Sequence, residues 1–345
     1  MSENEVAGGR LDEPSAETPE AHEPARLPWD RPGFWAVTSV STVLILLVLR
    51  FLEPEWLVPD PQAEWERRQE ELRVGYEALQ EQSARARERL QADMAEAHRR
   101  GIDRLVTENG GIELVRVPGG SFIMGSPEDE EGRWGSDNSV HRVTVPEFFI
   151  GSHEVTVEQY GRFLAANPWA SPPGLWEEQQ AHPRRPVVFV GWKRAKTYCK
   201  WVGGRLPTEA EWERACRAET TTRFWSGDEV SDLARVGWYQ ENSSERAHDV
   251  GELPANAFGL HDVHGNVSEW CNAGEQVERS HWSEKFSVLR GGSWTSSVSR
   301  CRSAARSSGR RLDGREPWFG FRACGGTVPG LEDSKPDEGQ AGEAD

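Results

Sequence analysis

The segment from Asn256 to Trp270, N-A-F-G-L-H-D-V-H-G-N-V-S-E-W, constrains the fold more than any other part of the chain. It sets two glycines, two asparagines and two acids among apolar residues. Such a mixture is too polar for a plain strand and too rich in glycine for the interior of a helix, so we predict a structured loop. A second run, from Val288 to Trp294, has the pattern of a short strand that ends in a glycine pair, where two backbones must pass close together.

Charged and apolar residues are unevenly spread over the 345 residues, which favours one large domain with appendages over two equal domains. Residues 1–32 and 331–345 supply −10 of the net charge of −17. This acidic balance speaks against nucleic acid as a partner. We predict disordered acidic tails at 1–31 and 327–345. The 16 tryptophans, most of them beyond Gly110, provide the buried area that an irregular core needs.

An uncharged run from Pro32 to Leu49 is followed, after Arg50, by two more apolar residues. About 20 residues at about 1.5 Å each span roughly 30 Å, the thickness of the hydrocarbon core of a bilayer. We therefore predict a transmembrane helix at 32–52 that attaches the protein to a membrane. A buried core helix and a cleaved signal peptide are the alternatives. No small-residue cleavage site follows the run, which favours an uncleaved anchor.

Residues 62–105 are rich in Glu, Arg, Gln, Leu and Ala, contain no proline and are predicted to be a long helical stalk. A thin apolar seam follows heptad spacing in this stalk. Two roles are open: a single solvated helix that acts as a spacer, and a coiled coil that forms a homodimer. The seam positions are Leu72, Leu79 and Ala86, together with Tyr76, Ser83, Leu90 and Ala97.

Beyond the break at Asn109-Gly110-Gly111, residues 112–326 form the main domain, for which we predict an α+β class with a loop-rich, irregular fold. Strands are expected at 112–117 and 121–124, joined as a hairpin, and at 143–145, 148–150 and 186–190. Helices are expected at 156–166, 192–202 and 209–218. Thr156 stands at an N-cap position, and Thr208 forms a capping box with Glu211.

The motifs of this domain occur in the order typical of one family. They are Gly119–Gly125, His153–Thr156 with Tyr160, Pro186–Trp192, Arg205–Glu213, Asn256–Trp270, Arg290–Trp294 and Gly320–Arg322. The domain resembles the formylglycine-generating, sulfatase-modifying factor family, whose fold is a variant of the C-type lectin fold. The resemblance covers about 113–326. It implies the fold more specifically than the activity, because the same fold serves sulfoxide synthases, pigment-maturation enzymes, lipoproteins and ligand-binding modules.

The oxidases of this family bind copper(I) through two cysteines with four residues between them, the first of which lies two positions after the aromatic residue of a Gly-Gly-Ser-aromatic motif. Counted from Trp294, these positions are Ser296 and Cys301, so one thiolate is missing. Counted back from the Ala-Ala-Arg sequence that follows, the loop is shorter than in the oxidases, which displaces Cys301 as well. Ser293 remains from the oxidase pocket, and Ser268 replaces a tryptophan. We predict a degenerate catalytic site at Cys301 and Ser293 that does not bind copper.

Two other metals have candidate ligands in the same segment. For a sulfoxide-synthase type of iron site, His264 and the nearby His261 lack an evident third ligand, and a hydrogen-bonded loop histidine is the alternative. The resemblance implies a structural calcium site, whose oxygen ligands suit that ion. Its implied ligands are the carboxylates of Asp262 and Glu269 and the carbonyls of Gly265 and Val267. The alternative is that both acids only cap amides of the loop.

The chain has five cysteines. The resemblance implies two disulfides, Cys199–Cys324 and Cys216–Cys301, which leave Cys271 free and buried. Five reduced core cysteines are the alternative. Disulfides would place the domain in an oxidising, extracytoplasmic space, either the periplasm or the cell surface, and the leader in the cytoplasm.

Together these patterns predict a single-pass membrane protein that presents the domain as a binding or assembly module without copper oxidase activity. An oxidoreductase with altered metal ligands is the alternative. The recognition face would consist of the loops 128–137, 220–249 and 307–316. Arginines around the last loop are candidates to bind a carboxylate or sulfate group, or else form a solvated basic loop: Arg306, Arg310, Arg311 and Arg315.

Overall fold

The computed structural model describes residues 60–135, 137, 139–272, 286–311 and 313–326. The predicted transmembrane span at 32–52 and the predicted tails at 1–31 and 327–345 lie outside these described residues. Within the described part, no helix is both long and apolar enough to cross a membrane. From Arg68 onward the described residues form one compact unit.

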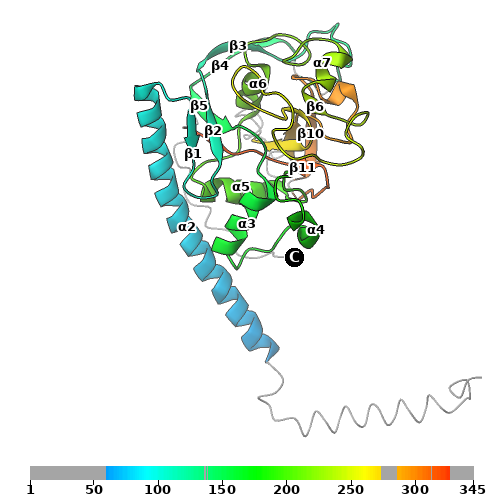
Figure 1. Ribbon diagram of the computed structural model, residues 1–345. Helices are drawn as coiled ribbons and strands as arrows, with labels where there is room; N and C mark the ends of the chain where they lie inside the picture. The colour runs from blue at the N-terminus through cyan, green and yellow to red at the C-terminus, as the bar shows by residue number, and fades with distance from the viewer. Residues whose placement is uncertain (1–59, 136, 138, 273–285, 312, 327–345) are drawn as a thin grey trace, which may run out of the picture. The chain divides into compact units, whose positions relative to one another are not determined.

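The helices are mostly short and surround an irregular core (Figure 1). They are α2 (Pro61–Arg100), α3 (Val157–Ala166), α4 (Trp176–Gln180), α5 (Trp192–Trp201), α6 (Glu209–Arg217), α7 (Val230–Ala234) and the 3-10 helix η2 (Val298–Arg300). Both α3 and α6 begin at capping boxes, Thr156 with Gln159 and Thr208 with Glu211. The predicted helices at 156–166, 192–202 and 209–218 are therefore confirmed.

Two four-stranded sheets organise the domain. The first has the order β1 (Arg104–Val106), β2 (Glu113–Val117), β5 (Phe148–Gly151) and β12 (Cys324–Gly325), with antiparallel pairs. The second has the order β10 (Arg306–Arg311), β9 (Phe286–Arg290), β8 (Ser268–Cys271) and β11 (Phe319–Gly320), in which β11 is parallel to β8. Two-stranded pairs are formed by β3 (Gly120–Met124) with β4 (His141–Val145) and by β6 (Gly237–Trp238) with β7 (His264–Gly265). This mixture of helix and sheet agrees with the predicted α+β class.

Two strand predictions are wrong. The strands β2 and β3 do not form a hairpin, because β2 pairs with β1 and β5 while β3 pairs with β4. The expected strand at 186–190 is an irregular segment with one bridge, between Pro186 and Thr156. Its residue Phe189 has a φ of 58°, which no extended strand allows. The Asn256–Trp270 segment is a loop as far as Val263 and then enters the short strands β7 and β8.

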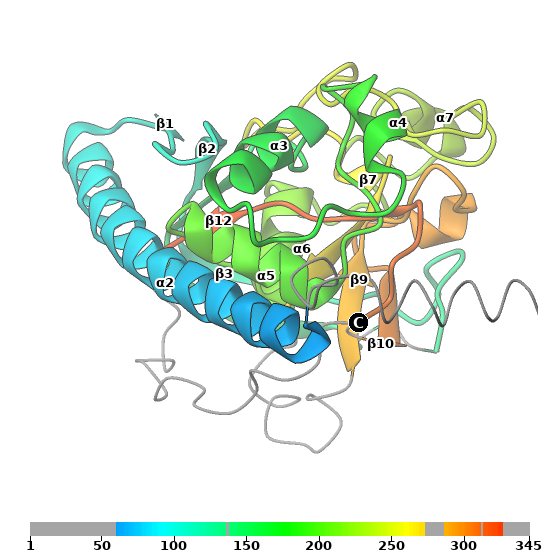
Figure 2. The same ribbon diagram turned by 90° about the horizontal axis from the view of Figure 1, so that it is seen from below.

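The prediction of a solvated spacer at 62–105 is wrong for the part of α2 beyond Leu79. Leu79, Leu90 and Ala97 are at most 5% exposed and belong to the main hydrophobic core cluster. These are seam positions, so the seam packs on the chain's own domain. Figures 1 and 2 show α2 running along the domain, with α5 beside it.

The contact between α2 and the domain is close. A Cβ on Gly203, which follows α5 and has a φ of 87°, would lie 2.4 Å from the carbonyl oxygen of Ala86. Nearby, Trp201 Nε1 donates a hydrogen bond of 3.2 Å to Gln82 Oε1. Glycine is therefore required where the loop after α5 crosses α2.

Candidate functional site

The turn from Gly291 to Trp294 borders a pocket of about 390 Å³ on the second sheet. Both glycines have positive φ angles, 85° and 73°, and a Cβ on Gly292 would lie 2.7 Å from Cys301 Sγ. The turn can therefore form only with glycine at this point. Hydroxyl groups dominate the lining of the pocket: Ser268, Ser293, Thr295, Ser296, Ser297 and Ser307.

Ser293 forms hydrogen bonds with two of the other hydroxyl residues in the lining. Its backbone N–H donates to Ser296 Oγ at 2.9 Å. Its own Oγ lies 3.0 Å from Thr295 Oγ1 and 3.1 Å from Ser296 Oγ. Among the described residues that line the pocket there is no histidine or carboxylate to act as a base. The serines are therefore suited to hydrogen bonding with a ligand rather than to nucleophilic attack.

The second predicted catalytic residue, Cys301, does not reach this pocket. Its side chain is fully buried in a small cluster with Phe224, Leu233 and Tyr239. Burial raises the pKa of the Cys301 thiol to about 12, so the thiol is protonated at neutral pH. The structure thus places Ser293 and Ser296 in the pocket, whereas the Cys301 thiol packs behind the turn, against Gly292, and does not line the pocket.

All five cysteines are free and buried, so neither predicted disulfide is formed. Cys216 Sγ faces the ring of His264, at 3.9 Å from Nε2, instead of Cys301. Cys199 lies near enough to Cys324 for the two thiols to interact electrostatically, but both are free. The prediction that Cys271 is free and buried is confirmed.

His264 is held as a neutral structural residue. Its Nε2 accepts a hydrogen bond of 3.1 Å from the N–H of Trp225, and its Nδ1 therefore carries the proton that it donates to the Cys301 carbonyl at 2.7 Å. Burial lowers the pKa of His264 to about 4. With both ring nitrogens engaged, His264 is not available as an iron ligand.

A second notable group is a cluster of buried acids around Arg322. Glu269 accepts hydrogen bonds from Nε and Nη2 of Arg322, both at 2.7 Å, and from Trp212 Nε1 at 2.8 Å. Asp262 Oδ2 accepts from the N–H of Gly251 at 2.7 Å, but its Oδ1 is buried without a partner. Both carboxylate oxygens of the fully buried Glu154 also lack a partner.

The charges of this cluster do not balance. Burial and the neighbouring Asp262 raise the pKa of Glu154 well above its usual value. Burial likewise raises the pKa of Asp262 to about 6. Three carboxyl groups face the single guanidinium of Arg322, so at neutral pH the cluster either retains protons or requires a cation.

The free oxygens suit a hard cation such as calcium. Within the described residues, no group of three or more His, Cys, Asp or Glu side chains is arranged to hold a metal. A calcium ion would therefore need main-chain carbonyls as further ligands, since Glu269 is occupied by Arg322. The implied carbonyl ligands, Gly265 and Val267, stay a prediction. A pocket of about 420 Å³ is lined by His153, Gly251 and His261, which neighbour the two acids, but neither acid lines it.

Of the arginines predicted to bind an anion, Arg306 lines the hydroxyl pocket but is already paired with Glu209, at 2.6 and 2.8 Å. The side chains of Arg310 and Arg311 lie outside the described residues, and Arg315 is exposed. The arginine that lines the pocket unexpectedly is Arg300.

Several residues of these two sites were not predicted from the sequence. Glu154 and Arg322 stand in recognised motifs, His153–Thr156 and Gly320–Arg322, but received no role. The available signal was a charged residue directly beside an apolar residue in each motif. Arg300 and Trp318 lie outside any motif, and only the folded chain brings them to the pocket.

Comparison with protein families gives a match of residues 105–325 to the sulfatase-modifying factor enzyme 1-like domain. The formylglycine-generating enzyme of Thermomonospora curvata is 31% identical over 218 residues, 46% of this chain and 70% of the relative. That of Mus musculus is 27% identical over 284 residues, 63% of this chain and 76% of the relative.

Other relatives have different names. The serine/threonine-protein kinase pkn1 of Chlamydia caviae is 32% identical over 225 residues, 56% of this chain, and the chain spans only 35% of that relative. Among solved structures, PvdO from Pseudomonas aeruginosa has a TM-score of 0.56 and 28% identity over 64% of this chain and 97% of its own. Treponema denticola variable protein 1, with a TM-score of 0.53 and 23% identity over 64% of this chain and 98% of its own, shares the fold.

Proposed function

The chain belongs to the sulfatase-modifying factor enzyme 1-like family, and we propose that it serves as a binding or assembly module of that family rather than as a copper oxidase. The observation that carries the proposal is the set of donor atoms at the Gly-Gly-Ser-Trp turn. A serine hydroxyl, that of Ser296, lies in the pocket, and the thiol of Cys301 is sealed in the core. Copper(I) prefers soft thiolate ligands, which this pocket lacks.

The alternative is an oxidoreductase with altered ligands. Its support is the 31% identity to a protein named formylglycine-generating enzyme. Against it stand the absence of a base among the residues that line the pocket and the raised pKa of Cys301. The match to about a third of a protein named as a kinase supports the view that such a domain serves in more than one protein context.

We further propose that calcium binds between Glu154 and Asp262 as a structural ion. The unpartnered buried oxygens of both residues support this. A bound divalent cation would offset the excess negative charge around Arg322 and replace the protons that the two acids otherwise retain.

The membrane anchor at 32–52 and the extracytoplasmic position of the domain are also part of the proposal. The apolar run supports the anchor. The five free thiols give the orientation no support, so digestion of intact cells with a protease, followed by detection of the C-terminal tail, is the test of it. Because Leu79, Leu90 and Ala97 face the domain, a homodimer through α2 would use its first turns, where Tyr76 is 49% exposed.

Copper binding separates the two functions. The purified full chain is titrated with copper(I) against a competing chelator and incubated with a cysteine-containing sulfatase peptide. We expect no stoichiometric copper and no converted cysteine. The variant Ser296→Cys is the matched comparison: it restores one thiol but leaves Cys301 buried, and we expect it to bind copper no better than a single exposed thiol does. One tightly bound copper per wild-type chain, or peptide conversion, would refute the module.

A further inference from the structure

The hydroxyl pocket, defined by Ser293, Ser296 and their neighbours, carries positive charge in an otherwise acidic protein. The only charged residues that line it in the described part of the chain are Arg300 and Arg306. Arg306 is neutralised by Glu209. The Arg300 guanidinium lies over the ring of Trp134, whose centroid is 4.0 Å away. Among the described residues, no carboxylate forms an ion pair with Arg300, and no acid lines the pocket.

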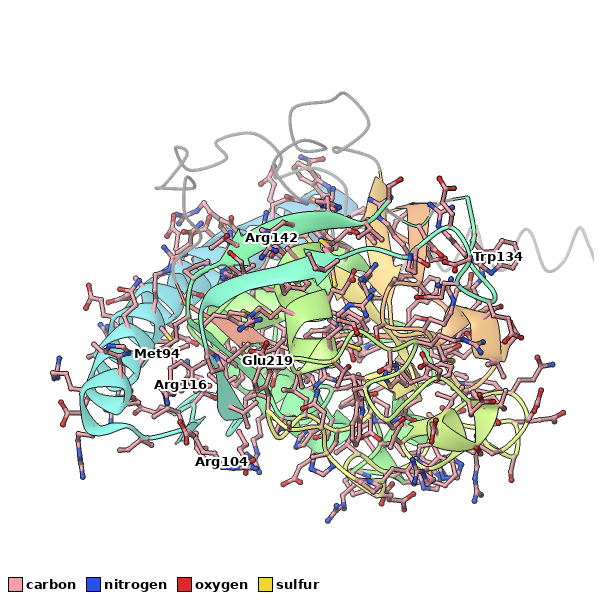
Figure 3. All side chains as sticks on the ribbon, turned by 90° about the horizontal axis from the view of Figure 1, so that it is seen from above. Met94, Arg104, Arg116, Trp134, Arg142 and Glu219 are labelled. Carbon is pink, nitrogen blue, oxygen red and sulfur yellow. The ribbon has the colours of Figure 1, made fainter. Side chains whose placement is uncertain are left out.

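The backbone of Trp134, on whose ring Arg300 stacks, is anchored by a buried ion pair. Trp134 Nε1 donates to Ser299 Oγ at 3.4 Å, and the backbone N–H of Trp134 donates to Asp137 Oδ2 at 2.9 Å. Asp137 is in turn held by the fully buried Arg302 at 2.5 Å. These contacts hold Trp134 and Asp137 of the predicted recognition loop 128–137 next to Arg300, and Figure 3 shows Trp134 projecting outward at this edge of the domain. A cation stacked on a fixed ring loses little conformational entropy when it binds an anion.

The remainder of the lining suggests what carries that anion. Six hydroxyl side chains and the amide of Gln240 can exchange hydrogen bonds with ligand hydroxyls. Trp318 and Phe319 add ring surfaces against which the C–H face of a sugar ring packs. The volume, about 390 Å³, lies in the usual range for small-ligand sites.

We propose that this pocket binds an acidic monosaccharide, with its carboxylate, sulfate or phosphate group at Arg300, its hydroxyls on the serines and its ring against Trp318. This inference rests on the proposed binding function and gives it a ligand class. The acid group is defined by its charge, and the three acids are separate arms of the test.

Calorimetric titration of the full chain with glucuronate, glucose 6-sulfate, glucose 6-phosphate and glucose provides the test. We expect at least one acidic sugar to bind at least about tenfold more tightly than glucose, and its affinity to fall between about 50 and 300 mM salt. Arg300→Gln should abolish this preference. The matched control is Arg235→Gln, which removes the same charge from the exposed arginine that follows α7 and pairs with Asp232. Trp134→Ala should weaken the binding of the acidic sugar several-fold and leave the affinity for glucose unchanged, because the Arg300 side chain loses the ring on which it stacks.

Equal affinities for glucose and the acidic sugars, or undiminished preference in Arg300→Gln, would overturn the inference, as would a lack of binding by every acidic sugar. The proposed function and the proposed ligand class can fail independently. Stoichiometric copper with intact Arg300-dependent sugar binding would remove the module function and leave the ligand class standing. If the protein bound neither copper nor any acidic sugar, only the proposed ligand class would be refuted, and the proposed function would stand.

Discussion

Replacing Leu90 by alanine tests whether α2 is part of the domain or a free stalk. The Leu90 side chain is 5% exposed and packs in the main core cluster. A Cβ on Gly325 in β12 would lie 3.3 Å from Leu90 Cδ2, so the leucine directly contacts the first sheet. Removing a buried leucine side chain costs about 2.7–5 kcal/mol, depending on how far the cavity collapses. A helix at the margin of the core can relax, so we expect about 3 kcal/mol.

In a domain of this size, 1 kcal/mol shifts the melting temperature by about 2–4 °C, so Leu90→Ala should lower it by about 6–12 °C. The measurement is urea unfolding followed by tryptophan fluorescence, together with a thermal scan. The matched control is Val74→Ala on the same helix, where the valine is 50% exposed. We expect that change to stay within about 0.5 kcal/mol, because alanine also favours the helix.

A loss of stability in Leu90→Ala no larger than that in Val74→Ala would refute the docked helix and restore the spacer. Gly203→Ala gives an independent check from the opposite side of the contact. The new methyl group would meet the backbone of Ala86 and would also force a φ of 87° on alanine. It should destabilise the protein without removing any apolar side chain.

Three further outcomes follow from the buried charges and thiols. Because the pKa of Asp262 is raised to about 6, its stabilising effect is complete below the unfolded value of about 3.8 and is lost as the pH rises through about 6. The calcium-free protein should therefore melt lower at pH 7.5 than at pH 5, and calcium should raise the melting temperature mainly at pH 7.5; no calcium effect at either pH would contradict the cation site. Arg302→Ala leaves the buried Asp137 without its ion-pair partner and should lower the free energy of unfolding by about 3–5 kcal/mol. Arg235→Ala, at an exposed arginine, should lower it by at most about 1 kcal/mol, and urea unfolding measures both. All five thiols should react with a disulfide reagent only after denaturation; fewer than five would reveal a disulfide.

Sequence patterns predicted the helices well because their signals are local. The capping boxes at Thr156 and Thr208 involve residues three apart, and each starts a helix at the expected position. Strand pairing depends on residues far apart, and there the prediction failed. The β2 strand takes partners on both sides, one of them β5, so a short Pro-Gly-Gly connection could not reveal its neighbours.

The role of α2 was missed for a similar reason. A heptad seam shows which face of a helix is apolar, but not what covers it. Here the cover includes the loop after α5, whose Gly203 lies more than a hundred residues along the chain. The buried acids show the same limit: the motif around Glu154 was visible, but only the folded chain places that carboxylate beside Asp262 and Arg322.

The pocket keeps its shape without the thiol pair because other residues hold its frame. Arg290, at the end of β9, is fully buried and pairs with Glu213 of α6 at 2.5 Å. The same guanidinium donates to the carbonyls of Ser303 and Ala304 and so ties both sides of the loop together. None of these contacts involves Cys301. The turn that we propose to bind a ligand and the groups that would perform oxidation are therefore held by different contacts, so the loss of the thiol pair need not alter the shape of the pocket.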